Sequence, residues 1–346
     1  MNSRFHLPAY RIGLPLLALT AAVLCKGNAP QIDPQLPDYR PEPFQVAADS
    51  PYLQPDGSIY IAGASAMRVG LGNLNALFIK NHPETKFTTL LSGSSVGAPA
   101  LLFNLTPFAV VDRIMLPEEL VPFEMEYENR DPIAVKIGHG SFSKLDLTPT
   151  MLICVNANNP IDHLTTEQVA RIFTTGGGEG DNTSWGQLGL GGEWARRPIQ
   201  PIGVARRTGE AVFMKTTKFG DFPFSDRYEG MKSADITPRL KNDVATIAMV
   251  DRAHLPTGAK LLAIGTSGEG PFYAPNYEEV AAGKYPYTSY IYLFINRIPG
   301  KPLDPFVREY IRMVLSKPGQ QALTNQANGF LPLSAADASA ELAKLQ

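Results

Sequence analysis

The feature that most constrains this fold is a serial alternation of short strand-like runs, tight turns and helices. Ser58-Ile-Tyr-Ile61 reads as a strand, Gly63-Ala-Ser65 interrupts it, and Leu71, Leu74 and Phe78 then recur at helical spacing. Strand–turn–helix units in series predict an α/β fold with parallel strands, because a helix returns the chain to the start of the sheet. Two further units follow. The strands are expected over residues 58–61, 86–91 and 107–111, and the helices over 67–81, 98–104 and from Pro117.

The same pattern restarts after residue 150, and 346 residues suffice for two domains of ordinary size. Thr165 is a plausible helix N-cap, because Gln168 stands three residues later as in a capping box. Each turn is expected at the carboxyl end of its strand, where open α/β sheets bind ligands. Strands are expected over residues 151–155, 200–204, 244–250, 260–264 and 290–295. Helices are expected over residues 164–173, 305–316 and 319–328, and a further helix follows the turn at residues 206–210 and continues through Lys215.

Composition excludes several classes of partner. The net charge of −2 gives no basic field for nucleic acid. Cys25 and Cys154 are the only cysteines, so there is no CxxC motif, and no His/Cys cluster has metal-ligand spacing. We expect no cofactor, no metal and no catalytic residue, and a monomer. Cys154 lies in an apolar strand-like run and is expected to be an inert core thiol.

The N-terminus resembles an export signal. Arg4 and Arg11 precede an apolar run over residues 12–24, which has the length of a signal-peptide core and is short for a membrane span. Cys25 ends the run and is a candidate lipidated cysteine, while residues 27–29 form a rival cleavage site; a buried N-terminal helix is the alternative reading. Residues 1–25 are therefore interpreted as a signal peptide or lipoprotein signal, and the Pro-rich residues 26–55 as an extended tether.

Two turns are candidates for anion binding. Ala64 and Ser65 follow the first strand, and Ser94 and Ser95 follow the second. Each turn precedes a helix, so backbone N–H groups, hydroxyls and a helix N-terminus are available to an anion. Gly and Ser are also ordinary turn residues, so a single such turn is weak evidence. Two turns at equivalent places favour a site.

Asp112 and Arg113 follow the third strand. An Asp beside an oxyanion is useful when the ligand carries a proton, because a carboxylate accepts a hydrogen bond from P–OH. Such an Asp favours hydrogen phosphate over sulfate, which has no proton to donate at neutral pH. The simpler reading is that Asp112 caps a turn and Arg113 is solvated.

A fourth turn, in the second half of the chain, carries Arg206, Arg207 and Thr208. An arginine can hold an oxyanion with two parallel N–H donors, and Thr208 could add a hydroxyl. Glu210 counts against a tight anion pocket, and a surface turn with two exposed arginines is the alternative.

From about Ser58 to Leu333 the chain resembles the phosphate-binding proteins of bacterial ABC transporters, the PstS-like branch of the periplasmic binding protein type II fold. The similarity lies in the order of the motifs. They are Gly93-Ser-Ser-Val-Gly97, Phe108-Ala-Val-Val-Asp112, Asn156-Ala-Asn-Asn-Pro160, Leu164-Thr-Thr-Glu-Gln168, Trp185-Gly-Gln-Leu188, Tyr285-Pro286, Tyr290-Ile-Tyr-Leu-Phe294, Leu315-Ser-Lys-Pro-Gly-Gln320 and Gly329-Phe-Leu-Pro332.

The resemblance implies two lobes, each a mainly parallel sheet flanked by helices, joined by crossover hinge strands. Lobe one would hold residues 56–148 and 286–346, and lobe two residues 149–285. It also implies an exported or periplasmic protein that captures phosphate or a related oxyanion and delivers it to an ABC permease. Some pocket positions depart from the family pattern: Ala66 or Met67 replaces a Thr, and Val110-Val111 replace a Ser.

Two other functions remain open. A secreted phosphatase would need an activated nucleophile or a metal pair, and the sequence offers no G-x-S-x-G elbow. His139 and His163 flank the expected crossover, and a structural role is the simpler reading for both. The altered pocket leaves a third option, an exported sensor or adhesin-like protein on the same scaffold.

Overall fold

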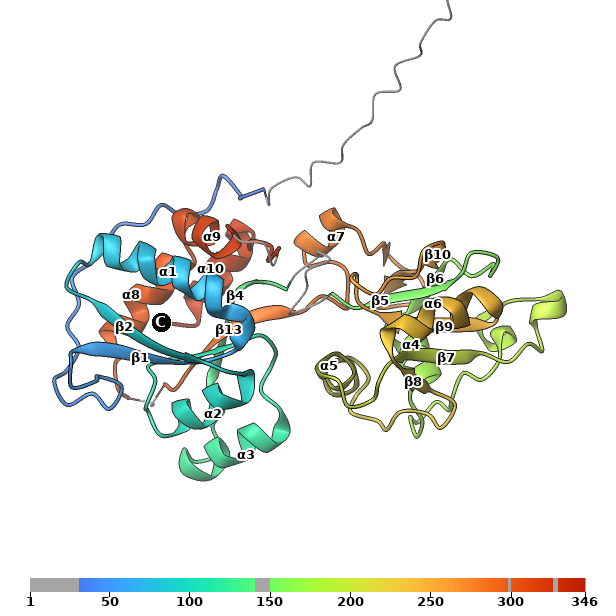
Figure 1. Ribbon diagram of the computed structural model, residues 1–346, viewed down its shortest axis with the longest axis horizontal. Coiled ribbons are helices and arrows are strands. Elements are labelled where there is room, and N and C mark those ends of the chain that lie inside the picture. Colours follow the sequence, from blue (N-terminus) through green and yellow to red (C-terminus); the bar gives the residue numbers. More distant parts are fainter. Residues whose placement is uncertain (1–30, 141–149, 298–299, 326–328, 346) are drawn as a thin grey trace, which may run out of the picture.

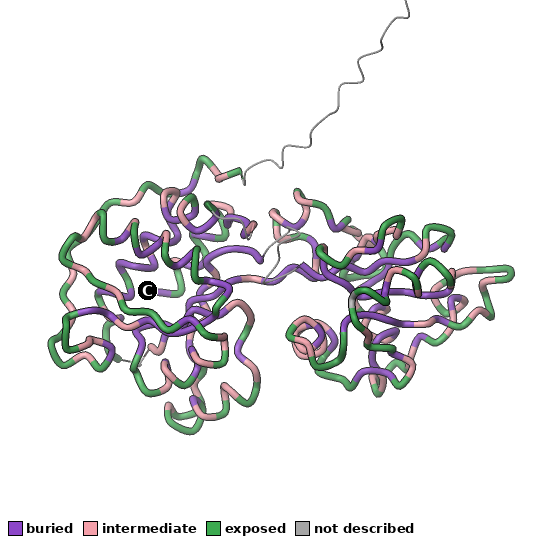
Figure 2. Tube along the Cα trace, viewed as in Figure 1, coloured by how far each residue is buried: buried purple, intermediate pink, exposed green. Residues whose placement is uncertain are grey.

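The computed structural model describes residues 31–140, 150–297, 300–325 and 329–345. Two lobes lie side by side, each built on its own five-stranded sheet (Figure 1). The chain leaves lobe one after strand β4 (Ile133–His139), enters lobe two at β5 (Leu152–Asn156), and returns along β13 (Tyr290–Ile295). Burial is concentrated in the strands and in the segments that join the lobes (Figure 2).

The sheet of lobe one has the strand order β2-β1-β3-β13-β4. Strands β2 (Lys86–Leu91) and β3 (Ala109–Val111) flank β1 (Ser58–Gly63), and both run parallel to it. Strand β13 pairs antiparallel with both β3 and β4. The carboxyl ends of β1, β2, β3 and β4 therefore share one edge with the amino end of β13. That edge faces lobe two, because β4 and β13 lead to and from lobe two there.

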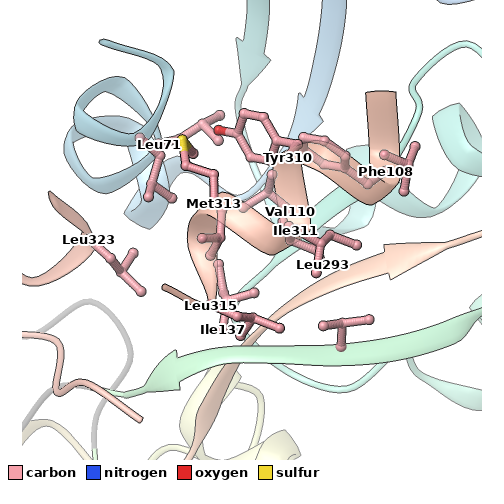
Figure 3. Packing of buried hydrophobic residues seen from close by; sticks show 14 of the residues in the cluster. Leu71, Phe108, Val110, Ile137, Leu293, Tyr310, Ile311, Met313, Leu315 and Leu323 are labelled. Atoms are coloured by element: carbon pink, nitrogen blue, oxygen red, sulfur yellow. The ribbon is translucent and has the colours of Figure 1, made fainter. Parts of the chain in front are cut away.

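Helices cover both faces of this sheet. One face carries the larger core, formed with α1 (Arg68–Asn81), α8 (Pro305–Val314), α9 (Lys317–Thr324) and α10 (Ala335–Ala343). Figure 3 shows Leu71, Tyr310, Met313 and Leu323 of these helices packed over the sheet residues Val110, Ile137 and Leu293. The short 3-10 turn Ser65–Met67 leads into α1. The other face packs against α2 (Ser94–Leu102) and α3 (Pro117–Glu126).

Lobe two repeats this layered design with the strand order β10-β5-β9-β7-β8. Helices α4 (Thr166–Phe173) and α5 (Gly209–Lys218) pack on one face, and α6 (Ser233–Asn242) packs on the other. The remaining strands of the sheet are β7 (Gln200–Val204), β8 (Glu229–Met231), β9 (Thr246–Val250) and β10 (Ala259–Leu261). A separate small sheet contains the strands β6 (His163–Thr165), β11 (Ala263–Gly265) and β12 (Phe272–Tyr273). The remaining short elements of lobe two are the helix α7 (Tyr277–Ala281) and the 3-10 turns Trp185–Leu188 and Gly192–Trp194.

The two-lobed α/β prediction is confirmed, and the structure refines one part of it. Each sheet is mixed rather than mainly parallel, because in each of them two strand pairs are parallel and two are antiparallel. The antiparallel pairs involve β4, β5 and β13, which carry the chain between the lobes. When the chain leaves a sheet and re-enters it through the same edge, the outgoing and returning strands must run in opposite directions. A series of strand–turn–helix units in the sequence does not reveal this reversal.

Local sequence signals predicted several elements closely. The bounds of β2, β7 and β13 agree with the predicted strands. The Thr165 hydroxyl accepts from the Gln168 amide at 3.0 Å, and Gln168 Oε1 accepts from the Thr165 amide at 2.9 Å, which is the predicted capping box. Helix α2 begins at Ser94 rather than at Ala98, so the serine-rich turn forms the first turn of the helix.

The Pro-rich segment differs from a free tether over residues 31–55, because it lies against lobe one. Leu36 and Tyr52 are buried in the core of that lobe, and Phe44 packs against Phe78 and Phe306. These apolar side chains occur singly between prolines, so they have no helical or strand periodicity. They nevertheless anchor an extended chain.

Two expectations concern cysteines and membranes. Cys154 is fully buried, and burial raises the pKa of its thiol to about 12, which fits an inert core residue. Across the described ranges, none of the helices combines the length and the apolar character required to cross a bilayer. The expected export signal over residues 1–25 and the candidate lipid anchor Cys25 lie outside the described residues.

Candidate functional site

Three loops of lobe one meet at the sheet edge that faces lobe two. The Ala64 amide donates to the Val110 carbonyl at 2.8 Å, and the Gly93 amide donates to the Gly63 carbonyl at 3.2 Å. These bonds join the loop after β1 to β3 and to the loop after β2. The carboxyl edge predicted from the alternation is therefore a single connected surface.

Ser94 and Asp112 are the predicted pair that the structure brings into direct contact. The Ser94 hydroxyl donates a hydrogen bond to Oδ1 of Asp112. Ser94 begins α2, so its amide has no acceptor within the helix, and Asp112 directly follows β3. A hydroxyl and a carboxylate, both partly exposed, thus lie beside a helix N-terminus at the edge of the sheet.

The other predicted lobe-one donors have different surroundings. Ser65 and Ser95 are exposed, and each lies at the start of a helical turn, so both hydroxyls are accessible from solvent. Ala64 is buried, and Val110 already accepts the hydrogen bond from its amide. Ala64 therefore positions the loop rather than donating to a ligand.

Arg113, the second candidate residue of the third turn, is paired within lobe one rather than solvated. Its guanidinium makes two hydrogen bonds with the Glu119 carboxylate, at 2.6 and 2.8 Å, and a third with the Ile114 carbonyl at 2.9 Å. Glu119 also accepts from the Leu116 amide at the start of α3. Arg113 therefore fixes the loop after β3, and its charge is matched by Glu119.

The lobe-two turn shows a similar division of roles. Arg206 donates to the carbonyls of Ser225 and Tyr228 at 3.0 and 2.8 Å, so it holds a neighbouring loop. The Thr208 hydroxyl accepts from the Ala211 amide and caps α5. Arg207 is exposed, and its side chain forms no hydrogen bond or ion pair with any residue that the structure describes. Of the two arginines, Arg207 thus has the guanidinium that is less engaged in contacts within lobe two.

Sequence reasoning missed a second acidic residue at the corresponding edge of lobe two. Asp251 directly follows β9, which runs parallel to β7, so both strands end at the edge that bears the Arg206 turn. The buried Asp251 carboxylate accepts from the His254 amide at 2.8 Å and contacts Nδ1 of its ring at 2.7 Å. The signal was present in the sequence, because Asp251 follows an apolar strand just as Asp112 does.

The two histidines considered from the sequence differ in environment. His139 ends β4, is fully buried and packs against the Tyr290 ring at a tilt, with 4.8 Å between ring centroids. Burial lowers the pKa of His139 to about 4, so its ring is neutral at physiological pH. His163 is exposed and contacts the Phe272 ring at 4.1 Å. Within the described ranges, no three His, Cys, Asp or Glu side chains converge in a way that could hold a metal ion.

Comparison with known proteins identifies the family. The model of the PBP superfamily domain matches residues 50–318. The phosphate-binding protein PstS of Pseudomonas aeruginosa is 28% identical over 331 residues, which cover 94% of this chain and 95% of that protein.

Solved structures support the same fold. The PstS structure from Borrelia burgdorferi aligns with a TM-score of 0.57 at 18% identity and covers 80% of this chain and 98% of its own. An ABC-type phosphate transport receptor from Vibrio cholerae aligns with a TM-score of 0.53 at 15% identity and covers 79% and 99%. The chain therefore belongs to the PBP superfamily and is a distant homologue of the phosphate-binding protein PstS.

Proposed function

We propose that this protein captures phosphate or a closely related oxyanion between its two lobes. The observation that carries the proposal is the Ser94–Asp112 hydrogen bond at the edge of lobe one that faces lobe two. In this arrangement the Ser94 hydroxyl holds the Asp112 carboxylate, which can accept the proton of hydrogen phosphate, and the N-terminal amides of α2 can donate to its other oxygens. The relationship to PstS supports the same ligand class.

Capture would involve closure of the lobes about the crossing segments. The Gly140 amide donates to the Ser289 carbonyl at 2.9 Å, and the Met151 amide donates to the Tyr287 carbonyl at 3.1 Å, so the outgoing and returning segments are tied together. A ligand that contacts Ser94 and Asp112 on one lobe and Arg207 on the other is bound best when both surfaces meet. Binding energy at both surfaces would then favour the closed state.

We further propose that the protein acts outside the cytoplasm and delivers its ligand to an ABC permease. The support is the apolar run over residues 12–24 behind Arg4 and Arg11, together with the relationship to PstS. The N-terminal sequence is compatible with two ways of acting outside the cytoplasm, namely export after cleavage of a signal peptide and attachment to a membrane through a lipid at Cys25.

The role of Asp112 can be tested by Asp112→Ala. In titration calorimetry with inorganic phosphate and with sulfate, the wild-type protein should prefer phosphate. The variant should bind phosphate roughly tenfold or more weakly, because a hydrogen bond to a charged acceptor is lost. Its preference for phosphate over sulfate should shrink as well.

Asp131→Ala is the matched control, since Asp131 is exposed and precedes β4 at the opposite edge of the sheet. The control should keep the wild-type affinity and selectivity. If the Asp112 variant and the wild type show equal selectivity for phosphate over sulfate, Asp112 does not accept a hydrogen bond from the protonated oxygen of the ligand.

A further inference from the structure

Asp251 and His254 form a hydrogen-bonded pair in the loop that follows β9 of lobe two. The Asp251 side chain is 7% exposed, and its two carboxylate oxygens lie 2.8 and 2.7 Å from Nδ1 of the His254 ring. A carboxylate accepts hydrogen bonds, so Nδ1 is the ring nitrogen that carries the proton in this contact. The other ring nitrogen, Nε2, makes no hydrogen bond with any described residue, and the His254 side chain is 44% exposed. The pair therefore presents one oriented ring nitrogen to its surroundings.

The turn that contains this pair does not require an imidazole at residue 254. Asp251 Oδ1 accepts from the His254 amide at 2.8 Å, and any residue other than proline would supply that amide. The contact between the ring and the carboxylate is additional, and it fixes the direction of the ring. In metal sites and catalytic sites, a carboxylate bonded to one imidazole nitrogen orients the other nitrogen toward its ligand.

The loop after β9 lies at the edge of lobe two that faces lobe one. Strand β9 runs antiparallel to β5, and Val250 pairs with Leu152, the first residue of β5. Strand β5 begins where the chain arrives from lobe one, and the preceding Met151 amide is bonded to the Tyr287 carbonyl of the returning segment. The carboxyl end of β9 is therefore on the same side of lobe two as the crossing segments.

The same edge bears the turn that contains Arg207. Strands β7 and β9 are parallel neighbours in which Gly203 pairs with Met249, and both strands end one residue later. Adjacent strands are about 4.8 Å apart, so residues 205–208 and 251–254 leave the sheet side by side. Helix α5, which follows the first of these loops, lies on the side of lobe two that faces lobe one (Figure 1).

An imidazole nitrogen suits a phosphate ion because either partner can supply the proton of their hydrogen bond. A protonated ring donates from Nε2 to a phosphate oxygen, and a neutral ring accepts at Nε2 from a P–OH group. Sulfate carries no proton at neutral pH, so it would leave a neutral ring with an unpaired acceptor. The Asp251 carboxylate is buried and bonded to the ring, in contrast to the partly exposed Asp112 of lobe one. In lobe two the contact with the ligand therefore falls to His254.

We infer that His254, oriented by Asp251, binds the phosphate ion through Nε2 and favours phosphate over sulfate. The inference rests on the proposed function and extends it, because it gives lobe two a means of selecting a protonated oxyanion in addition to the charge of Arg207. Asp251 is the positioning residue of the pair.

The central variant is His254→Asn, studied in the full-length protein by titration calorimetry with inorganic phosphate and with sulfate. The asparagine amide can still contact Asp251 from the place of Nδ1, but it has no atom at the place of Nε2. Phosphate should bind roughly tenfold more weakly than to the wild type, because a charge-assisted hydrogen bond is lost, and the preference over sulfate should shrink. His254→Gln, whose amide reaches the place of Nε2, should recover part of the lost affinity.

Asn158→Ala is the control, because Asn158 is exposed in the turn after β5, at the opposite edge of the same sheet. It should bind both ions as the wild type does. Thermal unfolding of the His254→Asn protein should match that of the wild type, since the ring is exposed and the turn keeps its amide contact.

NMR of the imidazole nitrogens tests the contact itself and the role of Asp251. In the wild-type protein the Nε2 signal of His254 should shift when inorganic phosphate is added. In the Asp251→Asn protein this shift should be smaller, because a neutral amide holds the Nδ1 proton less firmly than a carboxylate does. A histidine that only stabilised the turn would show no phosphate-dependent shift.

The outcomes separate the inference from the function on which it rests. If the wild type binds phosphate and the His254→Asn protein binds both ions with wild-type affinity, His254 does not contact the ligand, and the proposed function stands without it. If the wild type does not bind phosphate, the proposed function fails, and the inference fails with it.

Discussion

Gly63→Ala is expected to disrupt the candidate site and to destabilise lobe one by about 3 kcal/mol or more. A Cβ at residue 63 would lie 2.0 Å from the Val110 carbonyl oxygen and 2.8 Å from its carbon. Both atoms belong to the backbone of β3, so no side chain can rotate away. Strands β1 and β3 would have to separate, which would strain the bonds that Ala64 makes with Val110 and Gly93 makes with Gly63.

The measurement is urea unfolding followed by calorimetry with inorganic phosphate, with Gly72→Ala as the matched control. Gly72 lies in α1, and a Cβ there would meet no atom within 4 Å. The control should be as stable as the wild type or more stable by up to about 1 kcal/mol, because alanine favours a helix over glycine. A Gly63 variant with wild-type stability and affinity would contradict the described contact between β1 and β3.

Glu309→Ala is expected to lower the free energy of unfolding by about 3 kcal/mol and to release the segment over residues 31–55. Glu309 is a buried carboxylate on α8 that accepts from the Tyr39 hydroxyl at 2.6 Å and from the Glu42 amide at 2.9 Å. Arg312 donates to it at 2.6 Å and also pairs with Glu42. Alanine would leave the Tyr39 and Glu42 donors without their acceptor.

Thermal unfolding measures the loss of stability, and limited proteolysis measures the release of the segment, which should become the first site of cleavage. Glu124→Ala is a suitable control, because Glu124 is exposed on α3 and should tolerate the change. Cleavage of the Glu309 variant at the wild-type rate would mean that other contacts, such as the burial of Leu36 and Tyr52, hold the segment alone.

The sequence predicted the parts of this protein that depend on local patterns. The alternation of strand, turn and helix predicted β1, β2 and β3, and the apolar run that begins at Tyr290 predicted β13. Ser94 and Asp112 were predicted to share a site because each follows a strand of the same strand–turn–helix series, and the structure places both of these strands beside β1 in parallel. Their hydrogen bond shows that the two side chains do lie together.

Features that depend on contacts between different elements and loops were missed. The sequence alone does not show that Arg113 pairs with Glu119 of α3. It also does not show that Arg206 donates to the Ser225 and Tyr228 carbonyls. The Pro-rich segment reads as a tether because its anchoring side chains lack periodicity.

The most direct test of the account is titration of the full-length protein with inorganic phosphate while small-angle X-ray scattering follows the radius of gyration. The account predicts saturable phosphate binding, a decrease in the radius of gyration as the lobes close, and weaker binding of sulfate. Absence of heat with phosphate, together with clear binding of a ligand that is not an oxyanion, would contradict it.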